Sequence, residues 1–339
     1  QNLSREAMRT VMMAVMTGEA SAAQIGALLV SLRMKGEAID EITGAAEVMR
    51  ELVTSVTLAS DDAIDLVGTG GDGANLFNVS TAATFVAAAA GAKIAKHGNR
   101  SVSSSSGSSD VLEALGVSLT LTPEQIADCI ESVGVGFMFA PAHHGAMKYA
   151  VGPRKELGMR TLFNVLGPLT NPASVTRQVL GVYDAALCEP LARALQQLGS
   201  SHALVLHSED GLDEISIATS THGVELKSGE LTPLRIDPSD YGHGFDSLDG
   251  LQVETADASA ALIQSAFAGD QDGASCKARA IIALNAGAGI YVSGGADNLA
   301  DGIARADEAL GSGAAAQKLA EFVSFTQTLS AQPEGGSSI

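Results

Sequence analysis

The sequence is short of the features that mark several special classes of protein. Only 3 of its 339 residues are cysteine, and Cys129, Cys188 and Cys276 are too far apart for a disulfide framework or a zinc site. No apolar run approaches the roughly 20 residues that a membrane-spanning helix needs, and the first residues lack the apolar core of a signal peptide. We therefore expect a cytoplasmic protein with reduced cysteines and no membrane partner.

Basic residues are also scarce. Lysine and arginine number 20 against 39 aspartates and glutamates, which gives a formal net charge of −19. This balance argues against nucleic acid as a partner, because binding to its backbone needs a basic face. If the chain binds a small anion, backbone N–H groups, a few well-placed cations or a metal must neutralise that anion.

Hydrophobic residues make up 46% of the chain, enough for a large buried core. Residues 1–62 have helical periodicity, with a capping-box pattern at Ser21 and Gln24. From residue 63 short apolar strands alternate with helices, and a hairpin is expected around Ser228 and Gly229. The chain is therefore predicted to be an α/β protein. It has a small all-helical domain at 1–62 and a larger α/β domain at 63–339, whose mostly parallel central sheet is covered by helices.

The first motif with chemical content is GTGGD at residues 68–72, between a predicted strand and a predicted helix. Ligands bind beyond the carboxyl ends of parallel strands, and glycine-rich turns and helix N-termini supply N–H groups to anions. A tight turn without a ligand is the alternative. At the start of the helix, plain N-capping by Asn78 or Ser80 is the alternative to ligand contact.

A second motif, KHGNR at residues 96–100, ends the next predicted strand. It runs into residues 101–109, of which seven are serine. A flexible linker is one interpretation. The position between a strand and a helix of a compact domain favours an anion-binding loop, in which Lys96 and Arg100 would suit a diphosphate.

Two further clusters follow predicted strands. His143, His144, Lys148 and Arg154 are candidates for binding a second substrate, although a histidine pair is more often structural. The acidic cluster at residues 209–214 would ordinarily be a solvated loop. At a strand end, however, its Asp213 and Glu214 suit Mg²⁺, which often bridges carboxylates and substrate phosphates.

Taken together, these segments resemble the anthranilate phosphoribosyltransferase family. The matches are GTGGDGANLFNVST at 68–81, KHGNRSVSS at 96–104, LGPLTNP at 166–172 and GLDEIS at 211–216, in the family's order and over nearly the whole chain. The resemblance implies transfer of the phosphoribosyl group from 5-phosphoribosyl 1-diphosphate to the amine of anthranilate, in tryptophan biosynthesis. It also implies one or two Mg²⁺ ions and a homodimer formed through the helical domain, which a later segment near 155–180 would join.

The resemblance further implies a binding role for individual residues. Mg²⁺ would be held by Ser80, Asp213 and Glu214. Anthranilate would contact Gly68, Asn99, His144, Arg154 and Pro168. The phosphoribosyl donor would be surrounded by Gly68, Gly71, Asp72, Asn78, Val79, Ser80, Thr81, Lys96, His97, Gly98, Asn99, Arg100, Ser101, Val102, Ser103, Ser104 and Ser108. No residue is assigned as nucleophile, acid or base, so catalysis would rest on positioning and electrostatics.

Two positions depart from the family's pattern. Ser105 stands where many members have lysine, and Leu76 stands where a small hydroxyl residue is common. Loss of that lysine could weaken diphosphate binding or shift its work to Lys96 and Arg100. Two rival functions stay open at this point: a pyrimidine-nucleoside phosphorylase, and a nucleic-acid-binding protein of the same fold without the activity.

Overall fold

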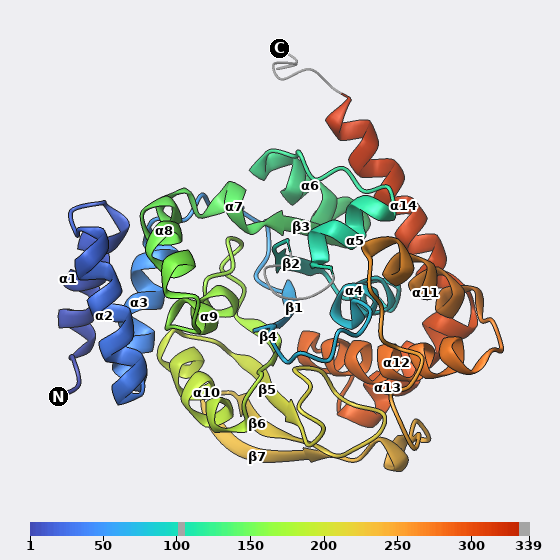
Figure 1. Cartoon of the computed structure of the whole chain (residues 1–339). Helices are drawn as coiled ribbons and strands as arrows, with labels where there is room; N and C mark the ends of the chain where they lie inside the picture. Colours follow the sequence, from blue (N-terminus) through green and yellow to red (C-terminus); the bar gives the residue numbers. More distant parts are fainter. Residues whose placement is uncertain (101–105, 332–339) are drawn as a thin grey trace.

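The N-terminal part of the chain is a bundle of helices. The computed structural model, which describes residues 1–100 and 106–331, shows this bundle at one side of the molecule (Figure 1). Three helices come first: α1 (Arg5–Met16), α2 (Ala22–Lys35) and α3 (Ile39–Glu51). Two later helices pack against them: α8 (Lys148–Leu157) on α1 and α2, and α9 (Phe163–Leu166) on α3. We call these five helices the helical unit.

Seven strands form one sheet, and the predicted fold class is confirmed. The strands are β1 (Ile64–Gly68), β2 (Ile94–Gly98), β3 (Val135–Phe139), β4 (Arg177–Gly181), β5 (His202–Ser208), β6 (Thr221–Lys227) and β7 (Glu230–Ile236). Their order is β3-β2-β1-β4-β5-β6-β7, and the first five are parallel. The predicted hairpin is β6–β7, with Ser228 and Gly229 at positive φ, as a two-residue turn between antiparallel strands requires.

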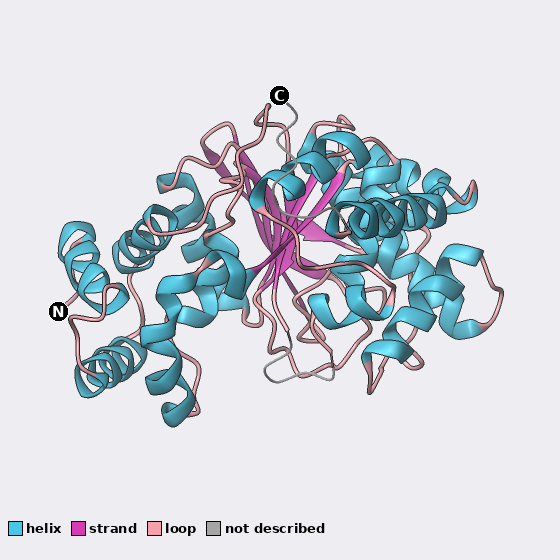
Figure 2. Cartoon of the chain, turned by 90° about the horizontal axis from the view of Figure 1, so that it is seen from above, coloured by secondary structure: helices cyan, strands magenta, loops and turns pink. Residues whose placement is uncertain are grey.

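Both faces of the sheet are covered by helices (Figure 2). Because side chains alternate along a strand, Leu204 and Leu206 of β5 pack with the core around α4 and α12, whereas Ala203 and Val205 pack with α10 and the helical unit. The helices outside the helical unit are α4 (Val79–Ala89), α5 (Ser108–Ala114), α6 (Pro123–Val133), α7 (Ala140–His143), α10 (Cys188–Gln197), α11 (Ala256–Ala268), α12 (Gly273–Ser293), α13 (Leu299–Gly311) and α14 (Ala314–Ser330). Within residues 1–100 and 106–331, no helix is long and apolar enough to cross a bilayer.

A glycine lets α12 and α13 pack closely. A Cβ added at Gly287 would lie 2.6 Å from Cα of Ile303, so Gly287→Ala would push the backbones of α12 and α13 apart. We expect this variant to lose about 1–3 kcal/mol of unfolding free energy, measured by urea denaturation. Gly273→Ala, on the same helix with no atom within 4 Å of the added Cβ, should be neutral or slightly stabilising. Equal stability of the two variants would contradict this account of the packing.

Candidate active site

The predicted motifs lie around the point where the strand order reverses. β1 lies between β2 and β4, and the chain proceeds from β1 to β2 on one side and from β4 to β5 on the other. In open parallel sheets the crevice beyond the strand ends at such a point is the usual ligand site. The glycine turn follows β1, KHGNR ends and follows β2, and the acidic loop follows β5, so all three open at this edge.

Hydrogen bonds bring the three segments together at the first turn of α4. The N–H of Gly70 donates to Asp213 Oδ2 at 2.6 Å, and the N–H of Ser80 donates to Glu214 Oε1 at 3.1 Å. Ser106, near the end of the serine stretch, donates its hydroxyl to Asn78 Oδ1 at 2.9 Å. Segments more than 100 residues apart in the sequence therefore share one site.

The interpretation of Asn78 as a simple helix cap is wrong. Its side chain makes no capping hydrogen bond to α4. Instead Asn78 Oδ1 accepts from the hydroxyls of Ser106 and Ser259, the latter on α11 at 2.8 Å. The side chain links the start of α4 to the serine stretch and to α11. In the first turn of α4, the N–H of Ser80 donates to the Glu214 carboxylate.

Two glycines make room for Asp213. Gly68 and Gly181 are register partners at the ends of β1 and β4. A Cβ at Gly68 would clash with the Asp213 carboxylate, and a Cβ at Gly181 would clash with the Asp213 backbone carbonyl. A side chain at Gly181 would displace the acidic loop, and one at Gly68 would displace the Asp213 carboxylate.

Negative charge is concentrated at this place. Burial, followed by repulsion from Asp72, raises the pKa of Asp213, and burial followed by repulsion from Asp213 raises the pKa of Glu214. A bound cation would offset both the burial of these carboxylates and the repulsion between them. Two carboxylates with the Ser80 hydroxyl are oxygen ligands of the kind Mg²⁺ takes. Among the described residues, no group of three or more His, Cys, Asp or Glu side chains is placed to hold a metal ion.

Lys96 is buried under the site. Its ammonium donates to the carbonyl of Leu66 and to Ser80 Oγ at 3.2 Å, so it lies beneath α4 on the metal side. Burial lowers the pKa of Lys96, and Asp65, Glu214 and Asp213 oppose that shift. The ammonium is therefore placed where it can neutralise charge around Ser80.

Asp65 and Asn171, which the sequence analysis missed, brace this lysine's strand. The fully buried Asp65 accepts from the N–H of His97 at 3.2 Å and from Asn171 Nδ2 at 2.8 Å. Burial raises the pKa of Asp65 to about 6. The available signal was a charged residue inside an apolar strand, since a buried carboxylate always needs partners.

His97 and His144 contact one another through Nε2 at 3.2 Å. Burial followed by repulsion from His144 lowers the pKa of His97 to about 3, and burial followed by repulsion from His143 lowers the pKa of His144 to about 4. Both rings are neutral at physiological pH, so the pair adds no positive charge to the site. His143 has a separate role, because its Nδ1 pairs with the carbonyl of Thr54 at 2.7 Å.

The two predicted arginines differ in their surroundings. Arg100 pairs with Asp110 and Glu113 of α5 and lies 5.6 Å from the ring centroid of Phe139, so its charge is already engaged. Arg154 is half-buried and stacks over Phe163 at 5.1 Å. It has no carboxylate partner within the part of the chain that the structure describes. Burial lowers its pKa, and an anion beside it would be strongly attracted.

The remaining predicted residues lie in helices, turns and strand ends. Val79 and Thr81 are buried in the first turn of α4, and Ser108 Oγ donates to the carbonyl of Asn99 at 3.4 Å. Pro168 is buried in a short 3₁₀ turn, residues Gly167–Leu169. Gly71 and Asp72 continue the glycine turn, and Gly98 ends β2. Ser101, Val102, Ser103, Ser104 and Ser105 lie outside the described residues.

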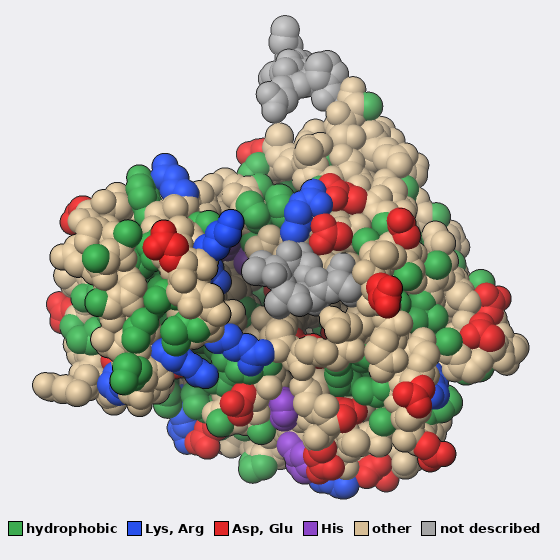
Figure 3. Space-filling model, viewed as in Figure 1, with side chains coloured by type: hydrophobic (Ala, Val, Ile, Leu, Met, Phe, Trp, Pro, Cys, Tyr) green, Lys and Arg blue, Asp and Glu red, His purple; other side chains and the backbone are tan. Residues whose placement is uncertain are grey.

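The surface reflects this distribution of charge. On the face drawn in Figure 3, lysine and arginine side chains gather where the helical unit meets the α/β part, and acidic side chains dominate the far rim. On this face, basic side chains therefore lie beside the site. That arrangement favours anionic ligands there.

Comparison with known proteins places the chain in a family. The family model described as "Glycosyl transferase family, a/b domain" matches residues 60–316, and the model of its "helical bundle domain" matches residues 1–53. The anthranilate phosphoribosyltransferase of Teredinibacter turnerae is 61% identical, over 96% of this chain and 95% of the relative. The chain belongs to the anthranilate phosphoribosyltransferase family. The enzyme of Marinobacter nauticus is 59% identical over 96% of this chain and 95% of its own.

Solved structures of the anthranilate phosphoribosyltransferase family share the fold. The Thermus thermophilus enzyme has a TM-score of 0.90 at 40% identity, covering 96% of this chain and 97% of its own. The Saccharomyces cerevisiae enzyme, solved in complex with PRPP and Mg, has a TM-score of 0.86 at 27% identity, covering 96% and 94%.

Proposed function

We propose that this chain transfers the phosphoribosyl group of 5-phosphoribosyl 1-diphosphate to the amine of anthranilate, yielding N-(5-phosphoribosyl)anthranilate and diphosphate in tryptophan biosynthesis. The observation that carries the proposal is the pair of hydrogen bonds Gly70–Asp213 and Ser80–Glu214. They set an anion-binding turn and helix N-terminus against two buried carboxylates. Family membership, with relatives named for this reaction, supports the substrates.

The donor would lie between the glycine turn, the start of α4 and KHGNR. Ser80, Asp213 and Glu214 would hold Mg²⁺, which when bound neutralises the diphosphate leaving group. The N–H groups of the glycine turn would orient the phosphates, and buried Lys96 would add positive charge near Ser80. The chain supplies no nucleophile, because the anthranilate amine is one, and its work is to position two substrates.

Anthranilate would bind beside Arg154, with Gly68, Asn99, His144 and Pro168 around it. A guanidinium matches both oxygens of a carboxylate, and Arg154 has its charge available. The neutral His97–His144 pair offers hydrogen bonding without adding charge. The aromatic amine is itself neutral at pH 7, so attack needs no strong base.

The decisive assay follows the fluorescence of anthranilate on mixing with the protein, 5-phosphoribosyl 1-diphosphate and Mg²⁺. We expect fluorescence loss that requires all three. Thymidine with phosphate tests the nucleoside phosphorylase alternative, and turnover there with no anthranilate consumption would overturn the proposal. A salt-sensitive shift of single-stranded DNA would favour the nucleic-acid-binding alternative.

Metal affinity should depend on pH. Because burial and repulsion raise the pKa of Asp213 and of Glu214, protons compete with the metal at higher pH than for ordinary carboxylates. We expect Mn²⁺, titrated by electron paramagnetic resonance with donor present, to bind more weakly at about pH 6 than at about pH 8. Affinity that is equal at both, or higher in acid, would contradict the assignment.

A homodimer through the helical unit is part of the proposal. The large apolar side chains exposed there are Met34 at 84%, Val151 at 53%, and Tyr149 and Met159 at 40% each. Met34 and Val151 lie on α2 and α8, which pack together, so one partner copy could cover them. Met34→Glu with Val151→Glu should convert a dimer to a monomer in analytical ultracentrifugation. A wild-type monomer at all concentrations would exclude this partner.

A cytoplasmic location also stays a prediction. In its support, Cys129, Cys188 and Cys276 are all free. Burial raises the pKa of the Cys129 and Cys188 thiols. Both side chains therefore stay in the thiol form, which is a poor nucleophile.

A further inference from the structure

Asn285 is a buried amide in an otherwise apolar stretch of α12. It is 4% exposed and lies among alanine, glycine, isoleucine and leucine. Its oxygen accepts from the N–H of Ile215 at 2.9 Å, and its Nδ2 donates to the carbonyls of Ile215 at 3.0 Å and Ile281 at 2.9 Å. The side chain thus pairs with both the N–H and the carbonyl of Ile215, as a neighbouring strand would.

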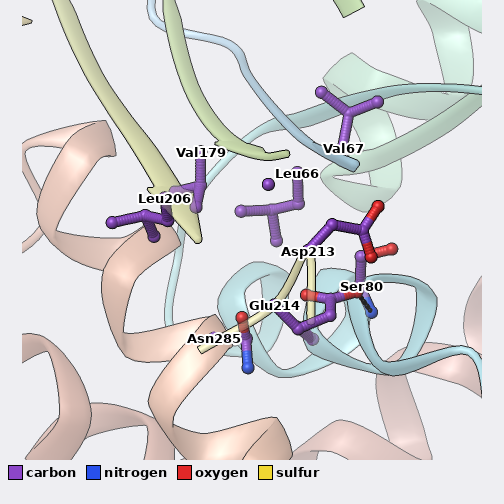
Figure 4. A pocket seen from close by; sticks show the side chains of 10 residues that line it. Leu66, Val67, Ser80, Val179, Leu206, Asp213, Glu214 and Asn285 are labelled. Carbon is purple, nitrogen blue, oxygen red and sulfur yellow. Dashed lines mark hydrogen bonds between the residues drawn. The ribbon is translucent and has the colours of Figure 1, made fainter. Parts of the chain in front are cut away.

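Ile215 directly follows the acidic pair. On the other side of the same backbone, Ser208 donates its hydroxyl to the carbonyl of Glu214 at 2.6 Å. The peptide unit between Glu214 and Ile215 is therefore fixed from two directions, by β5 and by α12. Figure 4 shows Asn285 beside Ser80, Asp213 and Glu214, and these residues line one cavity of about 10 Å³, room for about one water molecule.

The hydrogen bonds from Asn285 and Ser208 oppose a repulsion that favours outward movement of the acidic loop. Asp213 and Glu214 are buried next to each other, and Asp72 adds a third negative charge. Repulsion and the loss of hydration both favour a loop that swings its carboxylates toward solvent. Without Asn285, Ile215 would leave a buried N–H and a buried carbonyl unpaired, and the loop could relax outward.

We propose that Asn285 is a positioning residue for the metal site: through Ile215 it holds Asp213 and Glu214 in the geometry that binds the ion. The inference rests on the proposed function. It goes beyond it by assigning a role to a residue of α12 that is not among the proposed ligands of the metal or the substrates. Partners that orient metal ligands typically change affinity about 10- to 100-fold when removed.

The test is Mn²⁺ binding to the full-length chain with donor present, followed by electron paramagnetic resonance. Asn285→Leu, similar in volume but without hydrogen bonds, should weaken Mn²⁺ binding about 10- to 100-fold. It should leave the KM for anthranilate within about twofold, because the Arg154 side of the site is untouched. Asn285→Gln keeps an amide that can both accept and donate, and it should lose less affinity than Asn285→Leu.

Ile282→Val, a buried change on the same helix, is the matched control for lost stability alone. Wild-type Mn²⁺ affinity in Asn285→Leu, with a lowered Tm only, would overturn the inference. If Asn285→Leu fails to fold, Ser208→Ala is used instead. It removes the hydrogen bond to the Glu214 carbonyl on the other side of the same peptide unit, and we expect the same loss of Mn²⁺ affinity. Wild-type protein that binds no Mn²⁺ with donor would count against the proposed function itself, and the inference would fall with it.

Discussion

Replacement of both acidic residues, Asp213→Asn with Glu214→Gln, should abolish most turnover. The substitutions keep the shapes and remove two negative charges from the place where α4 begins. We expect kcat/KM to fall about a thousandfold, equivalent to roughly 4 kcal/mol of transition-state stabilisation, because the ion that offsets the leaving group is no longer held. The dependence of the rate on Mg²⁺ concentration should shift or disappear, as steady-state kinetics over a metal titration will show.

Glu209→Gln provides the matched control for this experiment. Glu209 lies in the same loop, but its side chain is exposed and pairs with His222. Its replacement should leave both the rate and the metal titration unchanged. Metal titration curves that stay the same in the double variant would remove the acidic pair from the catalytic site, whatever happened to the rate.

Arg154→Ala should raise the KM for anthranilate far more than that for the sugar diphosphate. Arg154 is half-buried with its charge available, and a charge-assisted hydrogen-bonded pair of this kind is worth about 1.5–3 kcal/mol. We therefore expect an increase of roughly 10- to 100-fold for anthranilate, measured with the donor saturating.

Arg154→Lys should recover part of this loss, since it restores the charge without the planar fork. Arg193→Ala is the control, because Arg193 is exposed on α10 and pairs with Glu189 one turn away; its KM values should not change. An equal rise for both substrates in Arg154→Ala would contradict the role given to this residue.

Local signals predicted much of the architecture. The predicted capping box at Ser21 is present, since such a pair depends on residues within one turn. The β6–β7 hairpin followed from two residues at its turn. The strand order was out of reach, because apolar strands buried on both faces look alike in sequence and nothing local says that β4 lies beside β1.

The site was only partly predictable, because local signals reveal residues at strand ends but not contacts between distant segments. Residues at strand ends can be found from position, which located the glycine turn and the acidic pair. Asp65, Asn171 and Asn285 were missed, because each acts through a partner about 70 or more residues away. Likewise, the ion pair between Arg100 and Glu113 of α5 depends on the fold and cannot be read from the amino-acid composition. Buried polar residues within apolar segments were the signal that was available and unused.

The gap left by Gly68 and Gly181 bears on how this scaffold can be changed. Even one methyl group at either position would displace Asp213, so laboratory evolution for new acceptor substrates should return only glycine at both. Variation has to come from the acceptor side, around Arg154 and Pro168. Grafting the acidic pair into another open sheet will fail unless two adjacent strands there also end in residues without side chains.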